Sequence, residues 1–348
     1  MGTKLLTIKN ANLKPGRRVL LRADFNVPVN DKGEITDDKR IADSLVTIKY
    51  CLQKQVRLVI CSHFGRPDGK RVPEFSLRPV YERLQRLLPA VKIYFAEDCV
   101  GADVERQVAG LQNGEILLLE NTRFHAGEAA NDHDFARQLA ALGDIFVSDA
   151  FGAAHRAHAS TVGVATYLPS YAGFLLEREI KYLSHLIKNP RRPFTVIMGG
   201  KKIDDKLPLV TKMADIADYI LVGGKLAVDW QPLPEGHHAE ILVAEGATND
   251  ITPATVDAWE PIISSSKTIF WNGPLGRFED PQYALGTQAV ATLLAHSGAL
   301  TVAGGGDTAA AVKGFRFDHV STGGGAALEF MQGAVLPGIA CLQSKGGK

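Results

Sequence analysis

The sequence has little that would indicate a secreted, membrane-bound or zinc-binding protein. Its four cysteines are scattered and form no CxxC pair: Cys51, Cys61, Cys99 and Cys341. Such usage suits a reducing compartment and argues against structural zinc. No apolar run is long enough to cross a bilayer, and the first residues, MGTKLL, lack the apolar core of a signal peptide. We therefore expect a cytoplasmic protein with no membrane partner.

An excess of either charge is also absent. The 348 residues carry a formal net charge of +1, so bulk charge gives no reason to expect a nucleic-acid partner. Any basic site must be a local cluster. The ten histidines lack the spacing of metal ligands, and neither His155 nor His158 has an evident carboxylate or cysteine partner nearby. No histidine metal site is expected.

Strand-like and helical patterns alternate along the whole chain, which favours an α/β fold with parallel sheets built from βαβ units. A chain of 348 residues is too long for one ordinary core, so two domains are expected. In the first half, strands are predicted near residues 19–22, 56–60, 91–95, 116–119 and 145–147. In the second half, they are predicted near residues 194–198, 219–222, 241–243, 268–271, 300–303 and 318–320. Helical spacing occurs at residues 40–53, 135–142 and 173–189, and the last of these would connect the domains.

The ends of the predicted strands differ between the two halves. Ligands of open α/β sheets bind beyond the carboxyl ends of the strands. In the first half these ends are polar and often basic: Asp24-Phe25-Asn26, His63-Phe64-Gly65-Arg66, Asn121-Thr122-Arg123 and His155-Arg156. In the second half they are rich in glycine: Gly199-Gly200, Gly223-Gly224, Asn272-Gly273, Gly304-Gly305-Gly306-Asp307 and Gly323-Gly324-Gly325. Two domains with different ligands follow.

The glycine pair Gly199-Gly200 separates a predicted strand from a helical rhythm that begins with Leu207, Val210 and Met213 and lies beside Lys202 and Lys206. Glycines and a helix start bring free N–H groups close to phosphate, and two lysines four apart on that helix would share a face. No GxxxxGK[ST] motif is present, so this is not a P-loop. Two interpretations stay open: an anion between the lysines, or a solvated lysine pair after a tight turn.

A second glycine-rich segment, residues 304–308, follows a strand and opens a helix. Its glycines can cradle phosphates, and Asp307 can meet Mg²⁺ directly or through water. A tight turn capped by Asp or Thr is the alternative, but three glycines exceed what capping requires. Residues 321–325 repeat the design and would aim a second set of N–H groups at a ligand.

A set of basic residues falls at or near the strand ends of the first half: Arg22, Arg40, His63, Arg66, Arg123, His155 and Arg156. Any one of them can be an ordinary surface charge. Together on one rim they favour a small, multiply charged anion, because arginine offers a planar fork of donors. Asp24 and Asn26 either orient ligand hydroxyls or hold the arginines.

These segments together resemble the phosphoglycerate kinase family. The matching stretches, besides the surroundings of Arg40, are LRADFNVP (21–28), SHFGRP (62–67), LLLENTRFH (117–125), DAFGAAHRAHAST (149–161), MGGKKIDDK (198–206), WNGPLGRFE (271–279), GGGDT (304–308) and STGGGAALEF (321–330). The resemblance implies two Rossmann-like domains with parallel sheets flanked by helices, joined by a connecting helix and a hinge. It implies reversible phosphoryl transfer from 1,3-bisphosphoglycerate to Mg-ADP, giving 3-phosphoglycerate and Mg-ATP, by a monomer.

The same resemblance implies domain limits and residue roles. A phosphoglycerate-binding domain would span 1–172, a helix 173–189 and a nucleotide-binding domain 190–330, with the tail at about 331–348 packing back on the first domain. The acid would be held by Asp24, Phe25, Asn26, Arg40, His63, Phe64, Gly65, Arg66, Arg123 and Arg156, on a patch strengthened by Arg22 and His155. The nucleotide would be held by Gly200, Lys202, Lys206, Gly223, Gly224, Asn272, Glu279, Gly305, Gly306, Asp307 and Thr308, with Mg²⁺ at Asp307. The catalytic set would be Arg40, Lys202, Lys206, Gly305 and Gly325.

The chain departs from the family after Gly224. Residues 225–253 are shorter by several tens of residues than the segment that normally forms one wall of the adenine pocket. Smaller departures are Thr122, Ala153 and Lys201. Two alternatives to an active kinase follow: a catalytically impaired regulatory protein that binds phosphoglycerate, or a kinase with another phosphate donor.

Overall fold

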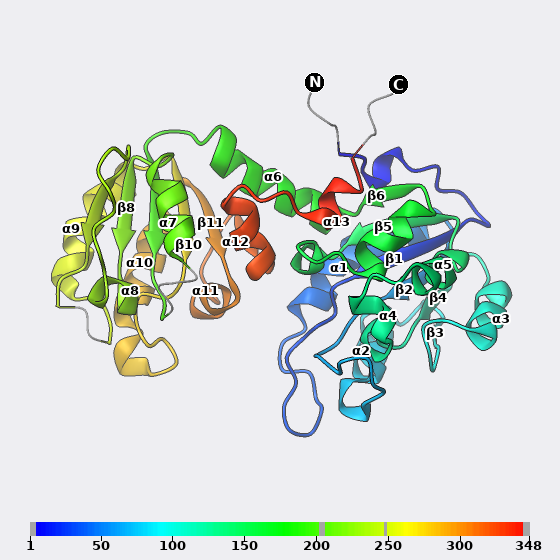
Figure 1. Cartoon of the computed structure of the whole chain (residues 1–348). Coiled ribbons are helices and arrows are strands. Elements are labelled where there is room, and N and C mark those ends of the chain that lie inside the picture. The colour runs from blue at the N-terminus through cyan, green and yellow to red at the C-terminus, as the bar shows by residue number, and fades with distance from the viewer. Residues whose placement is uncertain (1–4, 202–205, 247–248, 344–348) are drawn as a thin grey trace, which may run out of the picture. The chain divides into compact units, whose positions relative to one another are not determined.

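The computed structural model describes residues 5–201, 206–246 and 249–343, which form two compact units (Figure 1). Unit 1 comprises Met1–Arg178 with Val335–Lys348, and unit 2 comprises Glu179–Ala334. Each unit is built on a six-stranded sheet in which all paired strands are parallel. The predicted architecture of two parallel α/β sheets is therefore confirmed. Among the described helices, none combines the length and apolar character needed to cross a membrane.

The sheet of unit 1 has the strand order β3-β4-β2-β1-β5-β6. Its strands are β1 (Arg18–Ala23), β2 (Arg57–Cys61), β3 (Ile93–Phe95), β4 (Ile116–Leu118), β5 (Ile145–Asp149) and β6 (Ser170–Ala172). Its helices are α1 (Lys39–Gln53), α2 (Arg78–Leu87), α3 (Ala102–Gly110), α4 (Ala126–Ala129), α5 (His133–Ala141) and α13 (Pro337–Ala340). The central strand β1 is buried from Val19 to Ala23, in keeping with its apolar residues Val19–Leu21, and it also buries Arg22.

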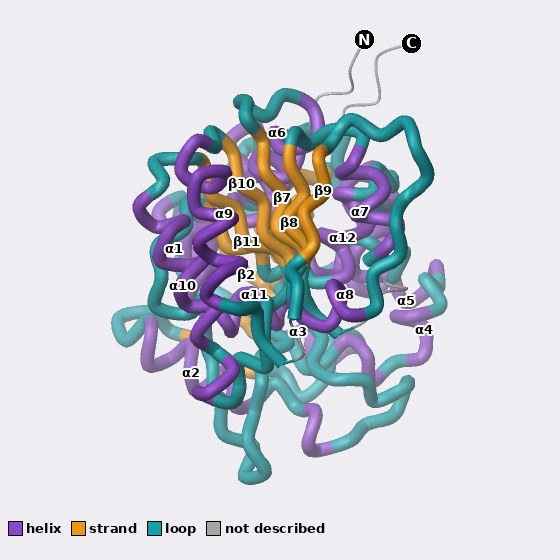
Figure 2. Tube along the Cα trace, turned by 90° about the vertical axis from the view of Figure 1, so that its left-hand side faces the viewer, coloured by secondary structure: helices purple, strands orange, loops and turns teal. Residues whose placement is uncertain are grey.

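The sheet of unit 2 has the strand order β12-β11-β10-β7-β8-β9. Its strands are β7 (Phe194–Met198), β8 (Tyr219–Val222), β9 (Glu240–Val243), β10 (Thr268–Asn272), β11 (Leu300–Gly304) and β12 (His319–Ser321). Its helices are α7 (Leu207–Ala214), α8 (Gly224–Val228), α9 (Pro253–Ser265), α10 (Leu285–His296), α11 (Gly306–Ala311) and α12 (Gly325–Met331). Figure 2 shows α9 and α10 on one face of the sheet and α7 on the other.

The helix predicted between the domains is α6 (Phe174–Lys188), whose residues span the boundary between the two units. The Asp149 carboxyl, at the end of β5, holds its first turn. Oδ1 accepts the N–H groups of Leu175 at 2.8 Å and Leu176 at 3.1 Å, while Oδ2 has no hydrogen-bond partner. Burial raises the pKa of Asp149 from 3.8 to about 6, although the Thr47 hydroxyl and both N–H groups oppose this. The charged carboxylate is thus costly in the folded protein at neutral pH.

We predict that Asp149→Asn stabilises the protein at pH 7. The folded pKa of Asp149 lies above its unfolded value, so wild-type stability from this group is greatest at low pH and falls as pH rises from about 4 to 7. The amide keeps one accepting oxygen and carries no charge. The free energy of unfolding of the variant, relative to wild type, should therefore rise by about 2 kcal/mol between pH 4 and pH 7 in urea denaturation. A difference that is independent of pH would contradict this assignment.

Candidate active site

Each sheet has one point where the connections that follow two neighbouring strands lead to opposite sides of the sheet. In unit 1 this point lies between β1 and β5, and in unit 2 between β7 and β10. Such a point, at the carboxyl ends of the strands, is the usual place for a ligand in open α/β sheets. In both units a cavity is lined by the loops that follow these strands or their neighbours.

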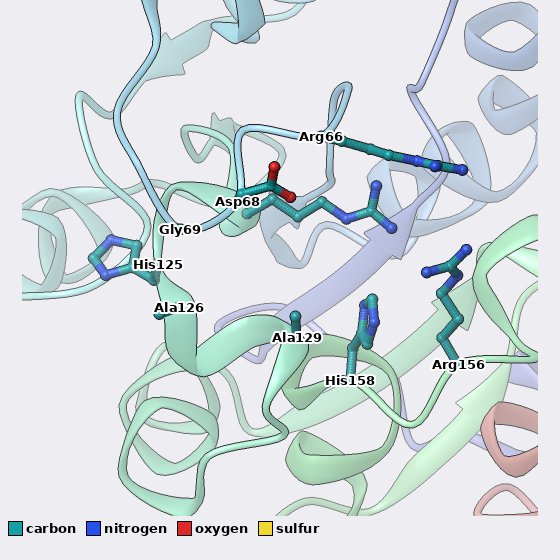
Figure 3. A pocket seen from close by; sticks show the side chains of 9 residues that line it. Arg66, Asp68, Gly69, His125, Ala126, Ala129, Arg156 and His158 are labelled. Atoms are coloured by element: carbon teal, nitrogen blue, oxygen red, sulfur yellow. The ribbon is translucent and has the colours of Figure 1, made fainter.

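The cavity of unit 1 has a volume of about 320 Å³ and is lined by three arginines. Arg66 follows β2, Arg123 follows β4 and Arg156 follows β5. Figure 3 shows Arg66 and Arg156 directed toward the same opening. The other lining residues are Asp68, Gly69, His125, Ala126, Ala129 and His158. The structure thus brings three of the predicted acid-binding arginines around one cavity.

The charges of these arginines repel one another. Burial, followed by the charges of Arg22, Arg156 and Arg66, lowers the pKa of Arg123 from 12.5 to about 10. A lowered arginine pKa means that the folded protein disfavours the positive charge. The Arg123 side chain is nevertheless held in place, because its Nη1 donates to the Gly65 carbonyl at 2.7 Å. A fixed, crowded set of guanidinium groups favours binding of an anion.

The loops after β1 and β2 are tied to each other and to α1. Asp24 Oδ2 accepts from Arg40 Nη1 at 2.8 Å, so Asp24 holds an arginine, one of the two roles left open for it. Asn26 Oδ1 accepts the Gly65 N–H at 2.9 Å. Gly65 has a φ of 60°, a conformation that other residues rarely adopt. These bonds fix the predicted acid-binding residues relative to the sheet.

Phe25 and Phe64, also predicted at this site, point into the core of unit 1. The Phe25 N–H donates to Ser62 Oγ at 2.9 Å, and the Phe64 N–H donates to Asn121 Oδ1 at 3.1 Å. Both N–H groups are therefore used within the fold. The two phenylalanines shape the loops from the core side.

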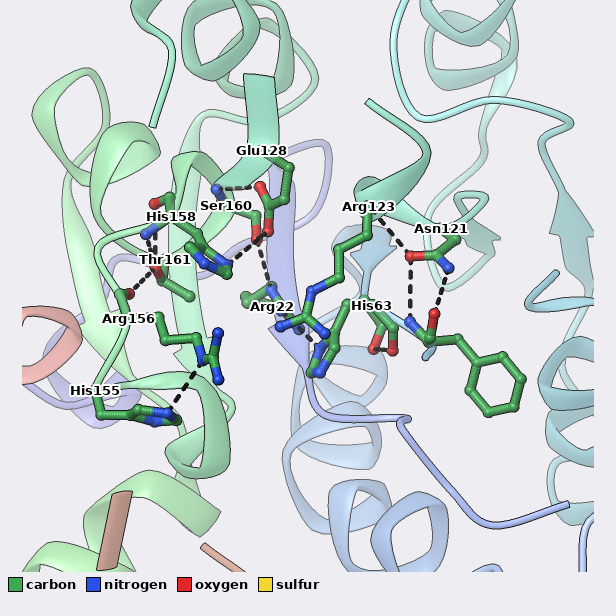
Figure 4. Close-up of polar contacts among 12 residues, drawn as sticks. Arg22, His63, Asn121, Arg123, Glu128, His155, Arg156, His158, Ser160 and Thr161 are labelled. Carbon is green, nitrogen blue, oxygen red and sulfur yellow. Dashed lines mark hydrogen bonds and ion pairs between the residues drawn. The ribbon is translucent and has the colours of Figure 1, made fainter. Parts of the chain in front are cut away.

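Arg22, expected to strengthen the basic patch, lies beneath it with 0% of its surface exposed. Its Nε donates to Ser160 Oγ at 2.7 Å, its Nη1 to the Ala23 carbonyl at 2.5 Å, and its Nη2 to His63 Nδ1 at 3.0 Å (Figure 4). Burial, and then the neighbouring arginine charges, lower the pKa of His63 well below 6.5. His63 is thus a neutral imidazole that accepts at Nδ1.

The interpretation that His158 has no carboxylate near it is wrong. Glu128, on α4, places Oε1 at 3.8 Å from His158 Nδ1, a distance too long for a hydrogen bond. Burial lowers the pKa of His158 to about 4, and Glu128 only partly opposes this, so the ring is neutral at pH 7. The other histidine of this segment, His155, accepts a hydrogen bond at Nε2 from Arg156 Nε at 3.1 Å.

The cavity of unit 2 has a volume of about 370 Å³ and is lined mainly by glycines, lysines and polar side chains. The lining residues are Gly200, Lys201, Lys206, Asn272, Gly273, Pro274, Gly305, Gly306, Asp307, Thr308, Gly324, Gly325 and Leu328. Bare backbone next to ammonium groups is suited to phosphate. Four of the predicted glycine-rich turns, at Gly200, Gly273, residues 305–306 and residues 324–325, therefore reach one cavity within this unit.

Lys206 is the N-cap of α7, which begins at Leu207, and the helical face expected for Lys202 and Lys206 stays a prediction. Lys202 lies outside the described residues. Lys206 Nζ donates to the Gly199 carbonyl at 2.5 Å, the Asn272 carbonyl at 3.3 Å and Asn272 Oδ1 at 2.9 Å. Its charge is held against the wall of the cavity by these oxygens.

Asn272 and Thr308 connect the glycine-rich turns. Asn272 Nδ2 donates to the Gly304 carbonyl at 2.8 Å. The Thr308 hydroxyl donates to the same carbonyl at 2.7 Å and accepts the Gly273 N–H at 2.7 Å. The Thr308 side chain is therefore already used within the fold, and its backbone is what it can offer to a ligand.

Three predicted nucleotide-binding residues, Gly223, Gly224 and Glu279, do not line this cavity. Gly224 adjoins its wall, because a Cβ there would lie 3.0 Å from the Pro274 carbonyl. Gly223 is backed by Leu275 and other core side chains. Glu279 is exposed.

The turn before α12 is held by a buried cluster on α6 and β12. Glu179 Oε2 is 2.8 Å from His319 Nε2, and Glu179 Oε1 accepts the Thr322 N–H at 3.2 Å. The Tyr182 ring stacks on His319 with centroids 4.7 Å apart. This cluster fixes the segment that leads into Gly324 and Gly325.

Asp307 is the one carboxylate among the described residues that line the unit 2 cavity. Mg²⁺ is commonly bound through one or two carboxylates and substrate phosphates, so this residue set suits a nucleotide-borne ion. In unit 1, Asp98, Cys99 and His125 lie close enough together to share an ion. There, Asp98 Oδ1 is already 2.7 Å from His125 Nε2, and burial keeps the pKa of the Cys99 thiol well above 9.0.

Several residues of these cavities were missed from the sequence. Pro274 and Leu328 line the unit 2 cavity, and Asp68, Ala126 and Ala129 line that of unit 1. Glu128 and Ser160 lie beneath the arginines with no exposed surface. No local pattern distinguishes these residues from ordinary helix or loop residues, so only their neighbours in space identify them.

The chain is similar to known proteins over nearly all of its length. The phosphoglycerate kinase family model matches residues 8–237 and 235–334. The chain is 42% identical to the phosphoglycerate kinase of Fervidobacterium nodosum and 43% identical to that of Thermosipho africanus, with 98% of each chain covered. The phosphoglycerate kinase structure from Coxiella burnetii matches with a TM-score of 0.83 and 33% identity, covering 97% of this chain and 99% of that one. The phosphoglycerate kinase structure from Pyrococcus horikoshii matches with a TM-score of 0.83 and 27% identity, covering 97% of this chain and 98% of that one.

These matches also locate the missing segment. The alignment with the Thermosipho africanus protein extends over 397 positions, which exceeds the 348 residues of this chain. The family model matches in two ranges that meet at residues 235–237. The relatives thus contain residues that this chain lacks, and the break falls within the predicted 225–253 segment.

Proposed function

Because this chain belongs to the phosphoglycerate kinase family, we propose that unit 1 binds the phosphoglycerate and unit 2 binds the nucleotide. The enzyme is a phosphotransferase that moves a phosphoryl group reversibly between 1,3-bisphosphoglycerate and ADP, giving 3-phosphoglycerate and ATP. The observation that carries the division is the contrast between the two cavities. One is lined by three arginines, the other by glycines and lysines.

On the acid side, Arg66, Arg123 and Arg156 would bind the phosphate of phosphoglycerate. Guanidinium groups match phosphate oxygens in pairs, and three of them can neutralise a doubly charged group. Asp24 and Asn26 would act mainly by fixing Arg40 and the Gly65 turn, as their hydrogen bonds indicate. Arg40 would meet the phosphoryl group that is transferred.

On the nucleotide side, the turns at Gly200, Gly305 and Gly325 would surround the phosphates, with Lys206 as a fixed cation. Asp307 would hold Mg²⁺ together with the nucleotide phosphates, and that ion would neutralise the charge that builds up on them. Phosphoryl transfer needs positioning and charge stabilisation more than covalent chemistry by the protein. This explains why neither cavity needs a nucleophile.

Turnover tests this proposal directly. Purified protein should form ATP from ADP and 1,3-bisphosphoglycerate only when Mg²⁺ is present. Calorimetry on the full chain should show separate binding of 3-phosphoglycerate and of Mg-ADP. Binding of the acid without turnover would favour the regulatory alternative, but the described Arg40, Lys206 and Asp307 all support a working kinase.

We predict weak discrimination among nucleotide bases. Among the described residues that line the unit 2 cavity, only Pro274 and Leu328 have apolar side chains, and the segment that the resemblance assigns to one wall of the adenine pocket is shorter here than in the relatives. Affinity would then come mainly from the phosphates. Since apolar contacts with a base contribute about 1–3 kcal/mol, we expect a KM for ADP that is about tenfold or more above that of a full-length relative.

The Thermosipho africanus enzyme is the matched comparison, because its alignment with this chain includes the additional residues. GDP and UDP should support turnover with kcat/KM within about tenfold of ADP in this protein. The relative should prefer purines more strongly. A preference for ADP as strong as that of the relative would show that other residues replace the missing wall.

We further propose that the enzyme acts as a monomer in the cytoplasm, where its substrates are produced. The family assignment and the four free cysteines support this setting. Light scattering on the purified protein and fractionation of its source cells test the two statements separately.

A further inference from the structure

We propose that Glu128 is a positioning residue for phosphoglycerate: acting through Ser160, it fixes Arg22, and Arg22 fixes His63 beneath the arginine-lined cavity. The inference rests on the proposed acid-binding role of unit 1. It assigns a function to two residues, Glu128 and Ser160, that do not reach the cavity themselves. Figure 4 shows the four side chains, of Glu128, Ser160, Arg22 and His63, linked one to the next.

Glu128 is a fully buried carboxyl on the four-residue helix α4, with 0% of its surface exposed. Its Oε1 accepts the Ser160 hydroxyl at 2.6 Å, and its Oε2 accepts the Ser160 N–H at 2.9 Å. A buried carboxylate is costly unless charges or hydrogen bonds compensate it. Here cationic side chains lie close to Glu128. The Glu128 charge raises the pKa values of both Arg123 and His158, whereas burial lowers them.

The hydrogen bonds of this chain of residues have a defined direction. An ionised carboxylate only accepts, so the Ser160 hydroxyl must donate to Glu128 and keep its oxygen free to accept. Arg22 Nε donates to that oxygen at 2.7 Å. Because arginine only donates, His63 Nδ1, 3.0 Å from Arg22 Nη2, must be the accepting nitrogen. The one proton of the neutral ring is therefore on Nε2, which His63 can offer to an anion.

The four residues come from segments far apart in the chain. Ser160 is 32 residues from Glu128, Arg22 is 138 residues from Ser160, and His63 is 41 residues from Arg22. Arg22 lies on the central strand β1 and is held at each guanidinium nitrogen. Loss of the Glu128 charge would release Ser160 to rotate, and Arg22 would lose the acceptor that sets its position.

The main test compares Glu128→Gln with a matched control, Glu120→Gln. Glu120 is also buried in unit 1 and accepts from the Ser76 hydroxyl at 2.7 Å and from the N–H groups of Leu77 at 2.8 Å and Asn121 at 2.9 Å. Its serine, Ser76, accepts the backbone N–H of Arg78 at 3.2 Å, where Ser160 accepts a guanidinium. Both variants should lose a few degrees of Tm. Only Glu128→Gln should raise the Kd and KM for 3-phosphoglycerate, by about tenfold, with kcat and the KM for ADP changed by less than about threefold.

Ser160→Ala separates the positioning of Arg22 from the simple loss of the Glu128 charge. It removes the hydroxyl that joins Glu128 to Arg22 and leaves Glu128 in place. We expect it to raise the KM for 3-phosphoglycerate by a similar factor. The double variant Glu128→Gln/Ser160→Ala should be no worse than the poorer single variant, since both interrupt one path. If Glu128→Gln does not fold, Ser160→Ala and the tautomer of His63 from its ring ¹⁵N shifts still decide the question.

Three results would overturn the inference while leaving the proposed function intact. They are an unchanged affinity for 3-phosphoglycerate in Glu128→Gln or Ser160→Ala, equal losses of affinity in Glu128→Gln and Glu120→Gln, and additive losses in the double variant. Failure of the wild-type protein itself to bind 3-phosphoglycerate would instead remove the proposed function, and with it the basis of this inference.

Discussion

Lys206→Ala is expected to lower kcat by about 10²–10³-fold, which is the usual cost of removing one preorganised group that stabilises developing charge. Lys206 Nζ is fixed by three oxygens of Gly199 and Asn272 at the wall of the unit 2 cavity. Its position is therefore set before the reaction, and its charge can act on the phosphoryl group as transfer proceeds. Kinetics at saturating ADP and 1,3-bisphosphoglycerate measure the effect.

The binding of 3-phosphoglycerate should be unchanged by Lys206→Ala, because the acid is assigned to the other unit. Lys212→Ala, in the last turn of α7, is the matched control and should leave kcat within about twofold. Arginine at position 206 should not restore the rate fully, since its planar group cannot reproduce three contacts made by one ammonium. A kcat within tenfold of wild type for Lys206→Ala would show that Lys206 is a structural lysine.

Arg123→Ala is expected to weaken the binding of 3-phosphoglycerate by about 10–100-fold. Hydrogen bonds to charged groups contribute about 1.5–3 kcal/mol. Arg123 is one of the three arginines that line the unit 1 cavity, and its side chain is anchored to the Gly65 carbonyl. Calorimetry gives the Kd directly. The Kd for Mg-ADP should stay within about twofold, which also tests the assignment of the two ligands to different units.

The same substitution should cost little stability in the absence of ligand. Burial and neighbouring arginines lower the pKa of Arg123 to about 10, so at neutral pH its charge is unfavourable in the folded protein, and its removal offsets the lost hydrogen bond. We expect the Tm without ligand to change by only a few degrees, and a given concentration of 3-phosphoglycerate to raise the Tm of wild type more than that of Arg123→Ala. Arg137→Ala, an exposed residue of α5, is the control for losing an arginine. A large drop in Tm for Arg123→Ala alone would indicate a structural role.

Most of the sheet could be predicted because its strands are short apolar runs that end at glycine or at polar residues. The strands at 194–198 and 219–222 agree to the residue, and β1, β2 and β4 agree to within one residue at each end. β6 was missed, since its three residues, Ser170–Ala172, are too few to form a pattern. The helical rhythm predicted from Leu207 agrees with the start of α7, and the structure makes Lys206 its N-cap.

The candidate site was predictable wherever a local signal marks a strand end. Glycine-rich turns after β7, β10, β11 and β12 indicate close approach of a ligand to the backbone, and arginines after β2, β4 and β5 indicate an anion. The partners beneath these residues could not be predicted. A glutamate and a serine on two short helical segments, Ala126–Ala129 and Ala159–Gly163, look like surface residues until the fold places both under the arginines with no exposed surface.

The sequence by itself determined which residue types stand at the strand ends, the alternation of strands and helices, and the resemblance to one family. The tertiary structure decided that Arg22 is internal, that Glu128 faces His158, and that Asp24 holds Arg40. The reason is physical: turn chemistry and hydrophobic periodicity depend on neighbouring residues. Contacts between distant segments depend on the strand order β3-β4-β2-β1-β5-β6, which no local pattern specifies.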